Sequence, residues 1–256
     1  MLKDFNSNSL RVRVYETRTK MGEAAAVEFA ELLRKELSEK QVVNVIFAAA
    51  PSQMDFLVAL RSQPNIDWKR VNAFHMDEYV GLSINCKQSF AGFVKEHVVD
   101  PLGIVNFYPI KGDAKNIKKE RLRYTKLLDK FKPDIVCCGI GENAHLAFND
   151  PGEADFFDSE IIKVVELDQV CRNQQVNDKC FDNIDKVPKY ALTLTVPVLL
   201  RAKSIFCLVP CETKADAVKK TILGEINDMC PATALRLHKN ANFYCDAQSG
   251  KYLLTD

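Results

Sequence analysis

One histidine and several carboxylate and amide side chains are concentrated in a single short stretch, GENAHLAFNDP, residues 141–151. His145 is followed five positions later by Asp150 and is preceded by Asn143. A carboxylate that orients an imidazole fixes its tautomer and raises its basicity, so this pair is suited to acid–base catalysis. A lone histidine beside an apolar strand is more often structural, and no second histidine has metal-ligand spacing. The stretch favours a catalytic histidine and no metal.

Two adjacent carboxylates, Asp77 and Glu78, follow another apolar segment in FHMDEYVGL. Burial and like charge can tune the pKa of such a pair, which makes both residues candidates for general base chemistry. The alternative is that both are ordinary solvated loop residues. His75, two positions before Asp77, is expected to be a packed core histidine.

Two further strand ends carry side chains that could hold an anion. In AAAPSQ, Ser52 stands between Ala50 and Gln53 where a helix should begin, so it is either a plain helix cap or a phosphate-binding hydroxyl. Taken alone, the loop favours the cap. Lys214 opens a later helix after IFCLVPCET, with Thr213 as the expected cap. A lysine at a helix start is unfavourable for the dipole but suited to holding an anion.

The elements that must position these side chains alternate between strands and helices. Continuous apolar runs in QVVNVIFAAA, PDIVCCGIG and SIFCLVP indicate strands buried on both faces. Amphipathic spacing predicts helices in EAAAVEFAELLRKEL and KNIKKERLRYTKLLDKF. Further strands are expected in RVNAFHMDEY, IIKVVEL, YALTLTV and NFYCDA, and further helices in QSFAGFVKEHVV, VPVLLRAK and TKADAVKKTILG.

This alternation implies right-handed crossovers and ligands beyond the carboxyl ends of the strands. We therefore predict an α/β fold over residues 1–256: a single three-layer α/β/α domain with a doubly wound, mostly parallel, Rossmann-like sheet.

The composition excludes several classes of function. The 256 residues carry 35 basic against 34 acidic side chains, which leaves no charge excess for nucleic acid or an anionic membrane surface. No apolar run reaches the ~20 residues of a membrane span, and the start of the chain lacks a secretion-signal pattern. Nine cysteines show no zinc-type spacing. We expect a cytoplasmic protein with reduced thiols.

Four ordered segments, spread over nearly the whole chain, resemble one family. FHMDEYVGL looks like F-N-M-D-E-Y-V-G-L, and GIGENAHLAFNDP is similar to G-x-G-x-D-G-H-I-A-F-N-E-P. VPKYALTLTVPVLLRAK resembles V-P-K-Y-A-L-T-V-G-x-x-x-L-x-D-A, and LRLHKNANFYCD follows L-Q-L-H-P-x-A-x-x-x-x-D. The family is that of the isomerising glucosamine-6-phosphate deaminases, in a wider group that includes 6-phosphogluconolactonases. The resemblance implies an enzyme that converts glucosamine 6-phosphate to fructose 6-phosphate and ammonia without a cofactor.

The resemblance also implies catalytic roles. Asp77, with Glu78 beside it, matches the carboxylate that moves a proton between C2 and C1 of the open-chain sugar. His145 matches the histidine that assists ring opening, and Asp150 replaces the glutamate that orients this histidine. The family's aspartate two positions before the histidine is Asn143 here, which we expect to hydrogen-bond the sugar or the imidazole.

A phosphate site is implied in the same way, by four residues that follow two strands: Ala50, Ser52, Gln53 and Lys214. The family's T-G-G-T loop is replaced by Ala-Ala-Pro-Ser at positions 49–52. Its phosphate-binding arginine has no clean counterpart: Arg172 lies nearby at a different spacing, and Lys179 could substitute.

Two other functions stay open. A 6-phosphogluconolactonase-type hydrolase lacks the M-D-E-Y and A-F-N-D/E-P segments, both present here. A non-catalytic sugar-phosphate sensor shares the fold but would not need Asp77, His145 and Asp150 together. Hexameric family members are activated by N-acetylglucosamine 6-phosphate through a serine and an arginine after F-N-E-P. The matching stretch here, GEADFFDSEIIK, is acidic and has no arginine, so we expect hyperbolic kinetics. A homo-oligomer is left open.

Overall fold

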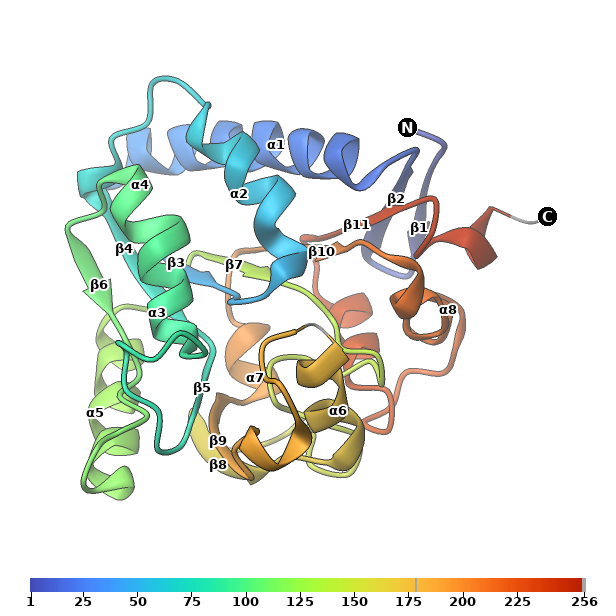
Figure 1. Ribbon diagram of the computed structural model, residues 1–256. Helices are drawn as coiled ribbons and strands as arrows, with labels where there is room; N and C mark the ends of the chain where they lie inside the picture. Colours follow the sequence, from blue (N-terminus) through green and yellow to red (C-terminus); the bar gives the residue numbers. More distant parts are fainter. Residues whose placement is uncertain (178, 255–256) are drawn as a thin grey trace.

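The main sheet joins strands from both ends of the chain (Figure 1). The computed structural model describes residues 1–177 and 179–254. Within them, eight strands lie in the order β1-β2-β11-β10-β7-β3-β4-β6. Their bounds are β1 Lys3–Ser7, β2 Leu10–Tyr15, β3 Val43–Phe47, β4 Val71–His75, β6 Asn106–Tyr108, β7 Ile135–Cys138, β10 Ser204–Val209 and β11 Ala241–Asp246. All neighbours are parallel except the hairpin β1–β2, so the predicted doubly wound, mostly parallel sheet is confirmed.

Helices cover both faces of this sheet. One apolar core cluster joins the sheet to α1 (Arg18–Glu39), α2 (Met54–Arg61), α3 (Phe90–Val94) and α4 (Asp100–Leu102). A second cluster, on the opposite face, joins it to α5 (Ile117–Lys130), α7 (Val196–Leu199) and α8 (Ala215–Leu223). Successive strand residues alternate between the two clusters, as in Val45 and Ile46, because side chains point to opposite faces of a sheet. The three-layer α/β/α architecture is therefore as predicted.

A smaller antiparallel sheet of β5 (Asp77–Tyr79), β9 (Tyr190–Leu194) and β8 (Ile162–Glu166) lies apart from the main one. RVNAFHMDEY, expected to be one strand, is thus two strands in two sheets. The break falls at Met76, whose carbonyl accepts a hydrogen bond from the amide of Leu194 instead of continuing β4. This break carries Asp77 beyond the edge of the main sheet.

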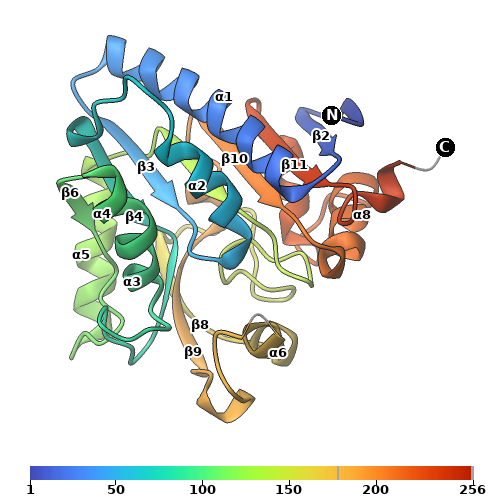
Figure 2. The ribbon, with the colours of Figure 1, turned by 45° about the horizontal axis from the view of Figure 1, so that its top comes forward.

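Several elements were not predicted, among them β1, β2, β6 and α6 (Gln169–Asn177). The strand β1, which is mostly exposed, and the short β6 carry no alternating pattern of their own. The helix α6 is largely polar and buries only Cys171, Gln174 and Gln175 on its inner side. Figure 2 shows α6 beyond the tip of the β3 arrow, beside β8 and β9. None of the described helices is both long and apolar enough to cross a membrane.

Candidate active site

A pocket opens beyond the carboxyl ends of four neighbouring strands, β10, β7, β3 and β4. Its walls come from the loops after these strands, the starts of α1 and α3, and α6. The chain runs outward in one direction from β3 through β4 to β6, and in the other from β7 through β10 to β11. A ligand crevice is expected where the strand order reverses in this way. The pocket thus lies at the strand ends, where the sequence predicts the site.

His145 and Asp150 form a preorganised pair on the floor of this pocket. Nδ1 of His145 lies 2.9 Å from Oδ1 of Asp150, and His145 lines the pocket while Asp150 is only 1% exposed. Burial acts to raise the pKa of Asp150, but the hydrogen bond and charge of His145, together with Asn143, hold it below its usual value. An anionic Asp150 leaves Nε2 of the imidazole to act on a ligand.

Local backbone geometry makes room for this imidazole. A Cβ atom on Gly141 would lie 2.2 to 2.5 Å from three ring atoms of His145, so only glycine fits there. Ala144, which stands at the family's glycine position, adopts the left-handed region with φ +66°. This conformation costs an alanine about 1 kcal/mol relative to the right-handed region. The turn between Gly141 and His145 nevertheless keeps the shape that a glycine would allow.

Asn143 hydrogen-bonds both members of the pair formed by His145 and Asp150. Its Nδ2 donates to Oδ1 of Asp150 at 2.9 Å and to Oδ2 of Asp168 at 3.2 Å, and its Oδ1 accepts from the amide of His145. Asn143 is outside the residues that line the pocket. Asn143 is expected from the sequence to hydrogen-bond the sugar or the imidazole, and in this structure its side chain bonds Asp150, Asp168 and the backbone amide of His145. Asp168 was not singled out from the sequence.

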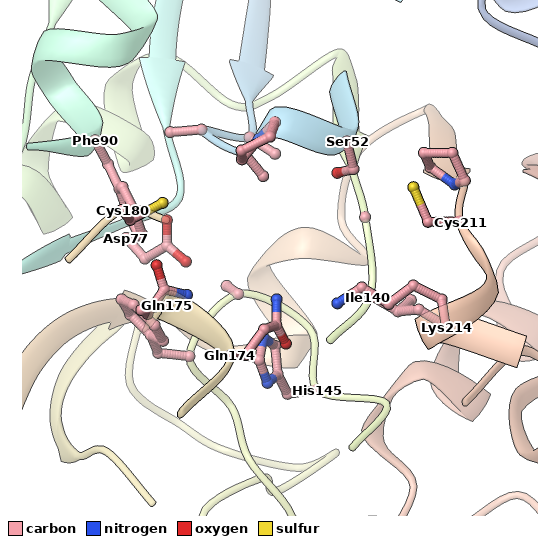
Figure 3. A pocket seen from close by; sticks show the side chains of 18 of the residues that line it. Ser52, Asp77, Phe90, Ile140, His145, Gln174, Gln175, Cys180, Cys211 and Lys214 are labelled. Atoms are coloured by element: carbon pink, nitrogen blue, oxygen red, sulfur yellow. The ribbon is translucent and has the colours of Figure 1, made fainter. Parts of the chain in front are cut away.

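Asp77 faces the same cavity from the opposite wall (Figure 3). The residue is 7% exposed, and no donor within the described part of the chain hydrogen-bonds its carboxylate. Burial, and then the neighbouring charge of Glu78, raise the pKa of Asp77 well above its ordinary value. Phe90 and Phe148 line the cavity with it. A carboxylate in such surroundings can accept a proton from carbon and return it.

Glu78 is not brought into the pocket, although it adjoins Asp77. Its carboxylate accepts hydrogen bonds from Oγ of Ser89 at 2.7 Å and from the amides of Phe90 and Ala91 at the start of α3. Neighbouring residues of a strand point to opposite faces, so only one of two adjacent carboxylates can face the ligand. Glu78 is thus a structural anchor for α3. His75 is fully buried, as expected, and its Nε2 accepts from the amide of Ile110.

The other end of the pocket carries Ser52 and Lys214 (Figure 3), and Ala50 also lines the pocket. Ser52 caps neither α2 nor the short turn before it, so the plain-cap interpretation is wrong. The expected cap by Thr213 is also wrong, since α8 begins at Ala215 without a side-chain cap. Thr213 and the largely buried Lys214 line the pocket instead.

Two of the expected phosphate ligands do not reach the pocket. Gln53 is 1% exposed, and its Nε2 donates to Oγ of Ser52 and to the carbonyl of Cys138, which ties the loop to β7. Arg172, on α6, donates to the carbonyls of Ile184 and Val187. These bonds turn the guanidinium away from the cavity, which it does not line.

Among the lining residues that sequence reasoning missed, three carry amide or guanidinium donors: Arg18, Gln174 and Gln175. The two glutamines lie on α6, whose polar sequence gave no helical signal. Arg18 is the first residue of α1 and is distant in sequence from every predicted site loop. Only tertiary packing brings it to the pocket.

His145, Asp150 and Cys171 form a cluster whose ligand-type atoms lie within 4.8 Å of one another. Burial raises the pKa of the Cys171 thiol far above its usual value, and the charges of Asp150 and Asp168 act in the same direction. A thiol that stays protonated is a poor metal ligand. The cluster is therefore better suited to hydrogen bonding beneath the imidazole.

Comparisons with known proteins agree with this geometry. Residues 16–244 match the family described as glucosamine-6-phosphate isomerases/6-phosphogluconolactonase. A glucosamine-6-phosphate deaminase of Listeria monocytogenes serotype 4a is 30% identical over 90% of this chain and 96% of its own. One from Clostridium perfringens is 29% identical over 95% and 100%.

Solved structures show the same relationship. A monomeric glucosamine-6-phosphate deaminase superposes with a TM-score of 0.86 at 27% identity, covering 95% of this chain and 99% of its own. The 6-phosphogluconolactonase of Trypanosoma brucei, at 15% identity and a TM-score of 0.77, shares the fold and covers 98% and 100%.

Proposed function

This chain belongs to the glucosamine-6-phosphate isomerase/6-phosphogluconolactonase family, and we propose that it converts glucosamine 6-phosphate and water to fructose 6-phosphate and ammonia. The observation that carries the proposal is the pair of opposed walls in one pocket. Asp77 lies on one wall with a raised pKa, and Ser52 and Lys214 lie across from it. A sugar phosphate has an acidic C–H bond near one end and an anion at the other.

His145 carries the first step in this proposal. Its Nε2, with Nδ1 held by Asp150, moves a proton between the C1 hydroxyl and the ring oxygen, which opens the sugar to the aldehyde. Asn143 supports the pair without titrating. The imidazole needs no metal for this proton transfer.

Asp77 carries the second step. The carboxylate removes the proton from C2 of the open-chain amino aldose, and the electron pair forms an enol-type intermediate between C1 and C2. Return of the proton to C1 leaves an imine at C2. Water adds to this imine, and the C–N bond breaks to give the ketone and ammonia. Anchoring the phosphate holds C2 against Asp77, so that binding energy assists the proton transfer.

The lactone hydrolase is the alternative within the same family. Hydrolysis of a lactone needs a water molecule activated beside a carbonyl and involves no C–H bond. A desolvated carboxylate without hydrogen-bond donors suits a carbon base better than a group that must position water. We therefore favour the deaminase.

A single assay distinguishes these functions. Purified protein is supplied with glucosamine 6-phosphate, and ammonia and fructose 6-phosphate are measured in parallel, with 6-phosphogluconolactone as the control substrate. We expect the two products in equal amounts, and no hydrolysis of the lactone above the spontaneous rate. Lactone hydrolysis without ammonia release would favour the hydrolase, and binding without turnover of either substrate would favour the sensor.

We further propose that residues 1–256 act as one cytoplasmic unit with hyperbolic kinetics. All nine cysteines are free thiols, the state that a reducing cytoplasm maintains. In the acidic stretch after Pro151, Lys163 is held by Asp158 and the carbonyl of Glu153, which leaves little positive charge for an activating phosphate. A sigmoidal rate curve that N-acetylglucosamine 6-phosphate makes hyperbolic would contradict this.

A further inference from the structure

Arg18 reaches between the two loops that form the cationic end of the pocket. Its Nη2 donates to the carbonyl of Pro51 at 3.3 Å, beside Ser52, and its Nη1 lies 3.4 Å from Sγ of Cys211, on the loop that leads to Lys214. The side chain is 40% exposed and lines the cavity. Arg18 therefore touches both loops that were expected to hold the phosphate.

Asp55 fixes the direction of this guanidinium. Nε of Arg18 donates to Oδ2 of Asp55 at 2.7 Å, and Thr19 donates to the other carboxylate oxygen. A guanidinium has five N–H groups in a planar fork. The contacts within the described chain use three of them, one on each nitrogen, so Nη1 and Nη2 each retain one N–H for a ligand.

We propose that Arg18 binds the substrate phosphate together with Lys214 and Ser52, an inference that rests on the proposed function. Among the described residues that line the cavity, Arg18 and Lys214 are the only lysine or arginine side chains and Asp77 is the only acid. A phosphate ester carries a charge of about −1.5 to −2 at neutral pH, which two cations can balance. The fork of a guanidinium matches two phosphate oxygens at once.

The loop beside Arg18 explains why an extra donor is needed. Residues 49–52 are Ala-Ala-Pro-Ser, and Pro51 has no backbone N–H to offer an anion. The side chains of Ala49 and Ala50 add no donor of their own. A guanidinium beside such a loop supplies the hydrogen bonds that the loop lacks.

The two basic residues considered from the sequence are not placed for this role. Nη2 of Arg172 donates to two backbone carbonyls and the side chain does not line the cavity, and Lys179 is exposed and outside the cavity lining. Arg18 is thus the guanidinium that the site holds in reach of a ligand.

The test compares Arg18→Gln with Lys20→Gln, which removes an exposed charge two residues further along α1. Calorimetric titration with inorganic phosphate gives Kd, and turnover of glucosamine 6-phosphate gives KM and kcat. Loss of a charge-assisted hydrogen bond predicts a Kd and a KM raised about 10- to 100-fold in Arg18→Gln, with kcat nearly unchanged. Lys20→Gln should match the parent protein in all three quantities.

A second pair of variants separates contact from simple charge balance. Arg18→Gln leaves Asp55 without its partner, and a free carboxylate would itself repel phosphate. If Arg18 only neutralises Asp55, the double variant Arg18→Gln/Asp55→Asn regains the parent affinity for phosphate, which would overturn the proposal. If Arg18 binds phosphate directly, the double variant binds phosphate as weakly as Arg18→Gln does.

Failure of this inference is distinguishable from failure of the proposed function. Phosphate titration requires no turnover, so weak binding by Arg18→Gln supports the assignment even if glucosamine 6-phosphate is not deaminated. Parent-like affinity in Arg18→Gln overturns it, and so does a loss of affinity confined to Lys179→Gln. Should Arg18→Gln fold poorly by circular dichroism, the double variant without the Asp55 charge carries the same test.

Discussion

Asp77 and Asp150 are two buried carboxylates at one site, and their surroundings differ in kind. Asp150 lies beside Nδ1 of His145 and accepts a hydrogen bond from Asn143, and these partners outweigh burial and lower its pKa. Asp77 has no donor in the described part of the chain, and burial and Glu78 raise its pKa. The pKa of the same functional group is thus shifted in opposite directions at two positions of one site.

The difference in pKa indicates that Asp77 and Asp150 have separate roles in catalysis. A carboxylate with a lowered pKa stays anionic, so it can orient and stabilise an imidazole without titrating. A carboxylate with a raised pKa takes up a proton more readily than an ordinary carboxylate and can give it back. Groups whose environments push their pKa values apart mark the acid and base assignments of a site. On this account Asp150 positions the imidazole of His145, and Asp77 exchanges the proton with the carbon atoms of the sugar.

The largest expected effect comes from removing the carbon base. Asp77→Asn should lower kcat by about 10²- to 10⁴-fold, because the amide cannot accept the C2 proton. Glu78→Gln is the matched control: it weakens the hydrogen bonds to α3, so thermal stability should fall while kcat changes much less. A larger loss of kcat in Glu78→Gln than in Asp77→Asn would reverse the assignment.

Loss of the His145 imidazole should lower kcat by a smaller factor, which depends on the form of the sugar. His145→Gln should reduce kcat on the closed ring by about 100-fold, since proton transfer to the ring oxygen loses its catalyst. Gly141→Ala should approach the same loss, because its Cβ would displace the imidazole. Steady-state rates of both variants check this, and near-normal turnover in His145→Gln would remove the imidazole from the mechanism.

The two carboxylates should also affect stability with opposite signs. The raised pKa of Asp77 means that its charged form opposes folding, a cost that is absent well below pH 3.8 and grows as pH rises toward the folded pKa. Asp77→Asn should therefore raise the free energy of unfolding at pH 7 by about 1 kcal/mol or more. The lowered pKa of Asp150 stabilises the fold above pH 3.8 and ceases to do so as pH falls through its folded value.

Asp150→Asn should accordingly lower the free energy of unfolding at pH 7 by about 1–3 kcal/mol. The difference in the free energy of unfolding between this variant and the parent protein should become smaller at acid pH. Denaturant titrations of both variants at neutral and acid pH measure these gaps, and equal shifts of the same sign would show that the two sites are not electrostatic opposites.

The smallest expected effect concerns Asn143. Asn143→Asp would place a third carboxylate against Asp150 and Asp168 in place of an amide that donates to both. We expect a loss of stability of about 1–2 kcal/mol with a modest change in kcat. Thermal denaturation and rates compared with the parent check this. An activity that appears only in the variant would instead point to a parent protein that senses sugar phosphates.

Sequence reasoning located the strand-end loops because their signals are local. The apolar runs before Ser52, His145 and Lys214 indicate buried strands, and parallel strands bring their carboxyl ends to one edge. The sequence also indicates that only one of Asp77 and Glu78 can face the cavity, because adjacent residues of a strand point to opposite faces. Only the break at Met76, set by the pairing of β5 with β9, decides which of them faces the cavity.

The remaining parts depend on packing between distant segments. Arg18 enters the pocket because α1 lies against α2, where Asp55 orients it. The partners of Asn143 include Asp168, which arrives with α6, a helix without an apolar pattern. Gln53 and Arg172 were expected at the phosphate, but Nε2 of Gln53 and Nη2 of Arg172 donate to backbone carbonyls of neighbouring segments.

Hydrogen exchange at carbon tests the role of Asp77 most directly. Fructose 6-phosphate and ammonium are incubated in D₂O with the parent protein, Asp77→Asn or His145→Gln, and deuterium at C1 is followed by NMR. The account predicts that the parent protein labels C1, that Asp77→Asn does not, and that His145→Gln retains far more exchange than Asp77→Asn. Exchange by Asp77→Asn at the parent rate would contradict it.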